Sequence, residues 1–308
     1  MALRNLEGAD QPIQLIPTFV KKKQFMLQVS ELYIYPIKSL PGVAVKQART
    51  TKTGFEHDRR WMLVDENNLF ISQREAPQMT QLQVAIEMDS LTITHKTTKE
   101  SLTIPFSKLP SGALGVSVTI WDDTCDAEYV SDEADAWFSK MLEIKCRLVY
   151  MPDETRRVVD QRYAPGDAIT SFADAYPFLI IGQASLDELN TRLAEPLPMN
   201  RFRPNIVFAG GLPFEEDTLK DFTIAGIKFS GVKLCARCPI TTINQDNGIR
   251  GKEPLKMLAS YRRKDNKVLF GQNLVHDGEG IISVGDSLEI SSFNDDERFM
   301  VNIPAEKI

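Results

Sequence analysis

The sequence predicts a mixed, mainly β protein of the α+β class, with two consecutive β-rich domains and a few helices. Two observations favour this fold class. Apolar and polar residues alternate in many short runs separated by turn residues, which is typical of barrels and sandwiches. Helical spacing or capping signals occur in only three short segments, and the length of 308 residues suits two domains.

The first domain is expected over residues 28–150, as a β-barrel-like unit. Its first strand begins at Gln28, and Pro36 should end or bend that strand. Ser131 resembles a helix N-cap, and apolar residues follow it at helical spacing up to Leu142. The predicted strands of this domain are 28–34, 43–48, 60–64, 69–71, 82–86, 91–94, 102–104, 116–120, 127–129 and 146–150.

The second domain is expected over residues 151–308. It opens with a polar segment, 153–170, that reads as a long loop, and long loops inside compact domains are often functional. Ser185 and Glu188 stand at capping-box spacing at the start of a predicted helix. Its predicted helices are 185–193 and 254–260, and its predicted strands are 176–182, 205–208, 222–224, 227–229, 231–234, 268–270, 273–275 and 287–291.

Residues 1–27 differ from the rest of the chain and are expected to form a poorly ordered extension. They mix polar and apolar residues, contain two prolines, and include Lys21-Lys-Lys23. No charged segment is followed by a long apolar one, so a signal peptide is not predicted.

Composition limits the possible partners and the compartment. The formal net charge of −6 gives no general support for nucleic-acid binding. No apolar run reaches the roughly 18 residues needed to cross a bilayer, so stable membrane insertion is not expected. Four cysteines are too few for a disulfide scaffold of this size, which favours reduced thiols and a cytoplasmic location. No glycine loop of the ATP-binding or dinucleotide-binding type is present.

The segment Val232-Lys-Leu-Cys-Ala-Arg-Cys-Pro-Ile-Thr-Thr-Ile243 is the strongest chemical signal. It places Cys235 and Cys238 three positions apart with Arg237 between them, and a nearby cation favours the reactive thiolate. Two thiols are half of a zinc site, and the scattered histidines do not complete it. A thioredoxin-like pair would open a helix, whereas Pro239 and the residues after it read as strand or loop. Two half-buried cysteines without a role remain an alternative.

Cationic and polar residues cluster at predicted strand ends. The clusters are Lys38-Ser39, Asp58-Arg-Arg60, Arg74 after Ser72, and Arg201, Arg203 and Asn205 around Pro204. Arginine and lysine beside serine and asparagine suit a bound oxyanion or phosphate. Surface salt bridges with nearby acidic residues are the alternative for each cluster taken alone.

Several of these motifs, in this order, resemble the MOSC family and, within it, the amidoxime-reducing component group. The resemblance covers roughly residues 28–292 and implies an N-terminal MOSC β-barrel domain followed by a MOSC domain. Its motifs are Tyr35-Pro-Ile-Lys-Ser39, His57-Asp-Arg-Arg-Trp61, Arg203-Pro-Asn205, Cys235-Ala-Arg-Cys238 and Phe270-Gly-Gln-Asn273.

The resemblance implies a cofactor and a set of residues that bind it. The cofactor is the molybdopterin form of the molybdenum cofactor, with Cys238 as the catalytic metal ligand. By position, Lys38, Ser39 and Arg59 should hold the phosphate, and Arg203 and Asn205 should contact the pterin. Arg74, Asp174 and Arg237 are further candidates for cofactor binding, and Cys235 should lie near the metal without binding it. Ala236 stands where some relatives carry a hydroxyl residue, which removes one possible hydrogen bond to the cofactor.

The implied reaction is the two-electron reduction of N-hydroxylated bases, amidoximes and hydroxylamines, with release of water. Pyridoxal phosphate is not expected to be required. Some bacterial relatives carry a ferredoxin-like domain with four cysteines, and this sequence has no such set after residue 292. Electrons should therefore come from a separate ferredoxin-like protein, flavin reductase or cytochrome b-type protein. The alternatives are a carrier of the cofactor and a sulfur-handling protein that uses a Cys238 persulfide.

Overall fold

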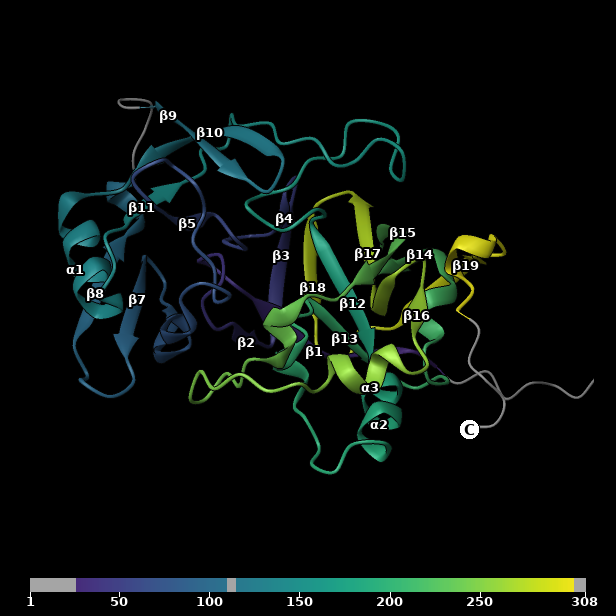
Figure 1. Cartoon of the computed structure of the whole chain (residues 1–308). Coiled ribbons are helices and arrows are strands. Elements are labelled where there is room, and N and C mark those ends of the chain that lie inside the picture. The colour runs from purple at the N-terminus through teal and green to yellow at the C-terminus, as the bar shows by residue number, and fades with distance from the viewer. Residues whose placement is uncertain (1–25, 110–114, 302–308) are drawn as a thin grey trace, which may run out of the picture.

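Residues 26–109 and 115–301 are described by a computed structural model, in which they form four β-sheets and three α-helices (Figure 1). The predicted extension 1–27 lies outside the described residues except for Met26 and Leu27. The mainly β fold class predicted from the sequence is confirmed. No helix in the described ranges is both long and apolar enough to span a bilayer.

The largest sheet has nine strands in the order β19-β14-β15-β17-β12-β13-β1-β2, with β16 paired to β17. All five residues of β12 are buried, as expected for a central strand. β12 and β13 are parallel, and α2 forms the crossover between them. The strands are β1 (Gln28–Ile34), β2 (Val43–Val45), β12 (Phe178–Gly182), β13 (Ile206–Ala209), β14 (Leu219–Ile224), β15 (Ile227–Ala236), β16 (Arg263–Lys264), β17 (Lys267–Asp277) and β19 (Leu288–Phe293).

The other sheets lie mainly in the first half of the chain. A four-stranded sheet has the order β5-β11-β10-β9, and two three-stranded sheets have the orders β6-β7-β8 and β18-β3-β4. Trp61 and Phe138 belong to one buried cluster that packs β5, β6, β7, β8 and β11 against α1. The strands are β3 (Gln47–Thr51), β4 (Gly54–Phe55), β5 (Trp61–Val64), β6 (Leu82–Ile86), β7 (Ser90–His95), β8 (Ser101–Pro105), β9 (Gly115–Ile120), β10 (Asp123–Tyr129), β11 (Arg147–Tyr150) and β18 (Gly280–Ser283).

The first strands of the chain pair with strands of the second half. β1 is antiparallel to β13, and β3 is antiparallel to β18 (Figure 1). The alternating apolar residues of β1 explain this, because Val29 and Leu32 enter the same buried cluster as Phe178 and Phe208. Two of the four sheets therefore contain strands from both sides of the predicted boundary between residues 150 and 151, and the other two lie wholly before it.

The structure confirms one predicted helix start and contradicts another. α1 (Asp132–Leu142) begins as predicted, because the Ser131 hydroxyl accepts a hydrogen bond from the Ala134 amide at 3.1 Å. The capping box predicted at Ser185 is wrong. α2 (Gln183–Thr191) begins two residues earlier, and Ser185 instead donates to the buried Glu216 at 2.7 Å and accepts from the Phe214 amide at 2.7 Å. α3 spans Leu255–Ala259.

Strand lengths in the second half also differ from the prediction. The runs 268–270 and 273–275 are parts of one long strand, β17, and the runs 227–229 and 231–234 are parts of β15. Gly231 is the reason in β15, since a Cβ there would lie 2.1 Å from the Leu219 carbonyl oxygen. A glycine inside a strand marks close backbone approach here rather than a strand end.

Candidate functional site

A cavity lies where residues from both halves of the chain meet, with about 810 Å³ of empty space including open solvent at its mouth. Its lining comes from the segment after β1, the end of β15, the hairpin between β9 and β10, and the segments around residues 174 and 203. Nine of the ten predicted site residues line it: Lys38, Ser39, Arg59, Asp174, Arg203, Asn205, Cys235, Arg237 and Cys238.

The two thiols of the cavity differ in their partners. Cys235 lies near the end of β15, and its sulfur accepts a hydrogen bond from Arg237 Nη1 at 2.9 Å. Burial raises the pKa of the Cys235 thiol, and Arg237 opposes this only in part. Cys238 precedes the 3₁₀ helix η5 (Pro239–Thr242), and its sulfur has no partner within the described residues. Of the two, Cys238 is therefore the thiol free to meet a ligand.

Lys38 and Asp174 form an ion pair in the cavity lining, with the Lys38 side chain buried and the Asp174 side chain exposed. Lys38 Nζ lies 2.7 Å from Asp174 Oδ1 and 2.8 Å from the Phe172 carbonyl oxygen. Burial lowers the pKa of Lys38 to about 8, although Asp174 works against this shift. Desolvation raises the pKa of Asp174, but the Lys38 charge and the hydrogen bonds from Lys38 and Trp121 outweigh it and hold that pKa below its usual range. Both groups are charged near neutral pH.

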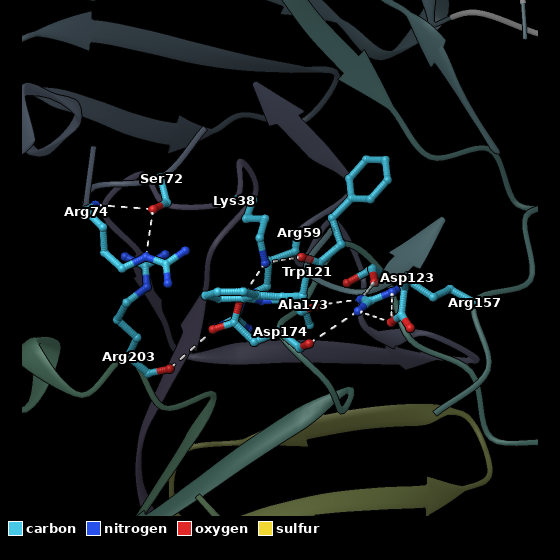
Figure 2. A network of polar contacts seen from close by, with 12 residues as sticks. Lys38, Arg59, Ser72, Arg74, Trp121, Asp123, Arg157, Ala173, Asp174 and Arg203 are labelled. Carbon is cyan, nitrogen blue, oxygen red and sulfur yellow. Dashed lines mark hydrogen bonds and ion pairs between the residues drawn. The ribbon is translucent and has the colours of Figure 1, made fainter. Parts of the chain in front are cut away.

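Asp174 is carried by a segment that a buried arginine holds in place. Arg157 Nη1 donates to the carbonyl oxygens of Ser171 and Ala173, at 3.0 and 2.5 Å. Its Nη2 donates to the Asp174 carbonyl oxygen at 3.2 Å and to Asp123 at 2.7 Å. Figure 2 shows Lys38, Trp121 and Arg157 converging on this segment. The sequence indicated Arg157 only as part of a polar loop.

Arg59 is fixed by its neighbours rather than free. Its Nη1 lies 2.5 Å from Asp58 Oδ2 and 3.0 Å from Asn205 Oδ1, and its guanidinium carbon lies 4.4 Å from the Tyr35 ring centroid. The Asn205 amide also donates to the Tyr33 carbonyl oxygen at 3.3 Å and accepts from the Leu179 amide at 3.3 Å. Asn205 thus positions Arg59 with an amide group that is already occupied by protein atoms.

Arg203 is a cation without a counter-ion. Its side chain has no hydrogen-bond acceptor or ion-pair partner in the described part of the chain, and its guanidinium carbon lies 4.3 Å from the Tyr35 ring centroid. Burial lowers its pKa to about 10, so it is still charged at neutral pH. An unpaired guanidinium facing a cavity is suited to bind an anion.

Ser39 is held by a pair of amides that joins the two halves of the chain. Gln73 Nε2 donates to the Ser39 carbonyl oxygen at 2.7 Å. The Gln73 and Gln245 side chains also exchange two hydrogen bonds, at 3.1 and 2.9 Å, and both residues are buried. Gln245 follows closely after η5, which Cys238 precedes. The amide pair therefore couples the Ser39 loop to the segment that carries Cys238.

Arg74 lies beside the cavity rather than in its lining. Its guanidinium carbon is 4.0 Å from the Trp121 ring centroid, and its Nε donates to the Ser72 hydroxyl at 3.2 Å. Ser72 and Trp121 both line the cavity (Figure 2). Trp121 was not predicted as a site residue, because nothing in its sequence context distinguishes it from a hairpin residue.

Several residues at this cavity have strained backbone conformations. Ser39, Arg59, Trp121 and Arg203 have φ values of 69°, 48°, 57° and 55°, a region that large side chains rarely adopt. They are four of the twelve non-glycine residues with positive φ in the described ranges. Such strain is typical of functional sites, where packing holds residues in costly conformations.

The charge of the cavity differs from that of the whole chain. Four cationic side chains and one carboxylate line it, whereas the chain has a formal net charge of −6. No group of three or more His, Cys, Asp or Glu residues suited to a metal occurs within the described residues. The chemistry of the cavity is therefore that of an anion site beside one free thiol.

Two family models match the chain. The MOSC N-terminal beta barrel domain matches residues 26–145, and the MOSC domain matches residues 167–289. Mitochondrial amidoxime-reducing component 1 of Mus musculus is 32% identical over 276 residues, which are 84% of this chain and 80% of that protein. Mitochondrial amidoxime reducing component 2 of Bos taurus is 33% identical over 275 residues, covering 84% and 81%.

A molybdenum cofactor sulfurase of Oryza sativa subsp. japonica is also similar. It is 30% identical over 279 residues, which are 84% of this chain but 34% of the sulfurase. The matched domains and the extent of the similarity confirm the resemblance drawn from the motifs. The chain belongs to the MOSC family, in the two-domain group that includes the amidoxime-reducing components.

Proposed function

We propose that the protein is a molybdenum-cofactor-dependent reductase of N-hydroxylated compounds, such as amidoximes and hydroxylamines. The single observation that carries the proposal is the free Cys238 thiol in a cavity lined by four cations. Relatives named amidoxime-reducing components support the substrate class. Electrons would come from a separate ferredoxin-like, flavin-dependent or cytochrome b-type protein. A cytoplasmic location stays a prediction.

The residues of the cavity fit the molybdopterin form of the cofactor. Thiolate sulfur is a soft ligand suited to transition metals, and Cys238 has no competing partner in the described residues. Arg203 lacks an acceptor, and Arg237 Nε is buried without one. Phosphate and pterin oxygens would accept hydrogen bonds from these donors, which would otherwise stay unpaired.

Each residue then has a task in binding or orientation. Cys238 would bind the metal, while Lys38, Ser39 and Arg59 would bind the phosphate and Arg203 the pterin. The cofactor, when bound, supplies a two-electron redox centre.

The remaining cavity residues support this arrangement. Asn205 would act through Arg59, Cys235 and Arg237 would flank the metal ligand, and Arg74 would bound the mouth. The Lys38–Asp174 pair can hold a proton near neutral pH, because the pKa of Lys38 is lowered to about 8 by burial.

A second candidate is a sulfur-handling protein that carries a persulfide on Cys238. The similarity to a cofactor sulfurase across 84% of this chain favours it over a simple cofactor carrier. Elemental analysis of protein made in a molybdopterin-producing host, followed by reduction of benzamidoxime with an artificial electron donor, tests the proposal. Molybdenum without turnover would favour the carrier. A protein free of molybdenum with sulfur added to Cys238, detected by mass spectrometry, would favour the persulfide.

A further inference from the structure

The segment 171–174, which brings Asp174 to the cavity, belongs to no strand and is held by two cationic side chains instead. Arg157 donates hydrogen bonds to three of its carbonyl oxygens, at 3.0, 2.5 and 3.2 Å. Lys38 Nζ donates to the remaining carbonyl oxygen, that of Phe172, at 2.8 Å. One arginine and one lysine therefore bind the backbone oxygens of four consecutive residues, which in a sheet would be bound by a neighbouring strand (Figure 2).

Arg157 has no hydrogen-bond donor left for a ligand. A guanidinium carries five N–H groups, and three of them bind the carbonyl oxygens of the segment 171–174. The other two, on Nε and Nη2, bind Asp123 Oδ2 at 3.0 and 2.7 Å. The Arg157 side chain is 3% exposed and is not part of the cavity lining. Arg157 therefore acts on the cavity through this segment and not by contact with a bound molecule.

Asp123 ties this arginine to the hairpin between β9 and β10. It is the first residue of β10, its side chain is 53% exposed, and it lies outside the cavity lining. Trp121, two residues earlier on the same hairpin, donates its indole N–H to Asp174 Oδ1 at 3.3 Å. The hairpin thus holds the segment 171–174 at two points, at the backbone through Arg157 and at the Asp174 carboxylate through Trp121.

The position of Asp174 decides how readily Lys38 loses its proton. Asp174 Oδ1 lies 2.7 Å from the buried Lys38 Nζ, but the Asp174 side chain is exposed and is free to turn into solvent unless its backbone is fixed. Asp174 raises the pKa of Lys38, whereas burial and the cations Arg157 and Arg59 lower it. The nearby Cys125 thiol is neutral, because burial raises its pKa to about 11. Without the carboxylate in place, Lys38 would be a buried amine among cations.

From these contacts we infer that Arg157 and Asp123 are positioning residues, which hold Asp174 against Lys38 and thereby keep Lys38 charged for anion binding. The inference rests on the proposed function, in which Lys38 binds the cofactor phosphate. Arg157 has two effects of opposite sign on Lys38. Its charge favours the neutral amine, whereas its hydrogen bonds fix the carboxylate that favours the ammonium. A substitution that keeps the charge and removes the hydrogen-bond geometry separates the two effects.

Arg157→Lys is that substitution, because lysine keeps the charge but lacks the planar fork of five donors. Sulfate binding to the full-length, cofactor-free protein is measured by titration calorimetry as a function of pH. The readout is the pH midpoint, the pH at the middle of the fall in sulfate affinity, which in the wild type should follow the pKa of about 8 that burial gives Lys38. Asp174→Asn should lower the pH midpoint by about one to two units, and Arg157→Lys should lower it by about one unit.

Two matched controls separate positioning from charge and from stability. Asp123→Ala should lower the pH midpoint by about half a unit. Asp122→Ala removes an exposed carboxylate from the same hairpin, one that does not bind Arg157 in the described part of the chain, and should leave the pH midpoint unchanged. Arg262→Lys alters another buried arginine, which binds Asp217 outside the cavity, and should lower the thermal midpoint without moving the pH midpoint.

A pH midpoint in Arg157→Lys that equals or exceeds that of the wild type would overturn the inference. So would an equal shift in Arg262→Lys, or a wild type that binds no sulfate or binds it without dependence on pH. If Arg157→Lys does not fold, the comparison of Asp123→Ala with Asp122→Ala decides, and equal pH midpoints in these two variants would contradict the inference. A protein that retains no molybdenum would refute the proposed function and leave these titrations valid, since none of them uses the cofactor.

Discussion

Arg237 Nη1 lies 2.9 Å from the sulfur of Cys235, and the same guanidinium donates to the Phe202 carbonyl oxygen at 2.5 Å. The arginine between the two thiols is thus committed to the first of them. The second, Cys238, has no such partner among the described residues. The motif therefore separates a structural thiol from a thiol that is available to a ligand.

This separation predicts unequal effects of two matched substitutions. Cys238→Ser should abolish molybdenum retention and activity, because a neutral hydroxyl replaces the soft thiolate. Cys235→Ser should keep most of both, since a hydroxyl can still accept from Arg237. Molybdenum content per protein, measured by mass spectrometry of the elements, decides between them. Equal losses would contradict the assignment of Cys238 as the ligand.

Arg203→Ala should weaken cofactor retention at least tenfold while the thermal midpoint changes little. The side chain has no counter-ion in the described structure, and its burial already lowers its pKa to about 10, so its charge adds little to stability. Molybdenum content and thermal unfolding are measured in parallel, with the exposed Arg263→Ala as the control. Unfolding of the Arg203 variant at normal growth temperature would show a structural role instead.

Lys38 should make anion binding dependent on pH. Burial lowers the pKa of Lys38 from 10.5 to about 8, so the ammonium group is charged below that pH and loses its proton above it. Sulfate keeps its charge across this range. Its affinity for the cofactor-free protein should be highest near pH 6.5 and fall about tenfold by pH 9.5. The experiment is a series of calorimetric titrations, and Lys38→Met should bind weakly at every pH. A wild type whose affinity does not change with pH would refute this role.

The Gln73–Gln245 pair should behave as one unit. Either single substitution to leucine leaves a buried amide without its partner, which costs about 1–3 kcal/mol of unfolding free energy. The double variant should lose less than the sum of the single losses, because no amide is left unpaired. Urea unfolding of the four proteins gives the coupling energy. Losses that simply add would mean that the two amides are independent.

The fold class could be predicted from local patterns in the sequence, and most of the cavity residues from the resemblance to a known family. Alternation in β1 indicates a strand, and the motifs that carry the family resemblance contain eight of the nine predicted residues that line the cavity. Contacts between distant segments leave no such pattern. Arg157 donates hydrogen bonds to three backbone carbonyls, and the Trp121 indole donates to Asp174. The tertiary fold brings these residues together, and no local sequence pattern indicates it.

Two further errors have the same origin. Ser185 has the spacing of a capping box, but its hydroxyl donates a hydrogen bond to a buried glutamate 31 positions away. The runs 227–229 and 231–234 look like separate strands, but both belong to β15, in which Gly231 makes room for a neighbouring backbone. Tertiary packing overrides the local signal in both cases.

The pairing of β1 with β13 and of β3 with β18 also has a consequence for biosynthesis. A nascent polypeptide cannot complete these sheets until β13 and β18 have been translated. The cavity, whose lining runs from Lys38 to Asn273, is likewise assembled only at that late stage. Insertion of a prosthetic group would then have to be post-translational. A nascent chain released early would expose unpaired strand edges to the cell's chaperones and proteases.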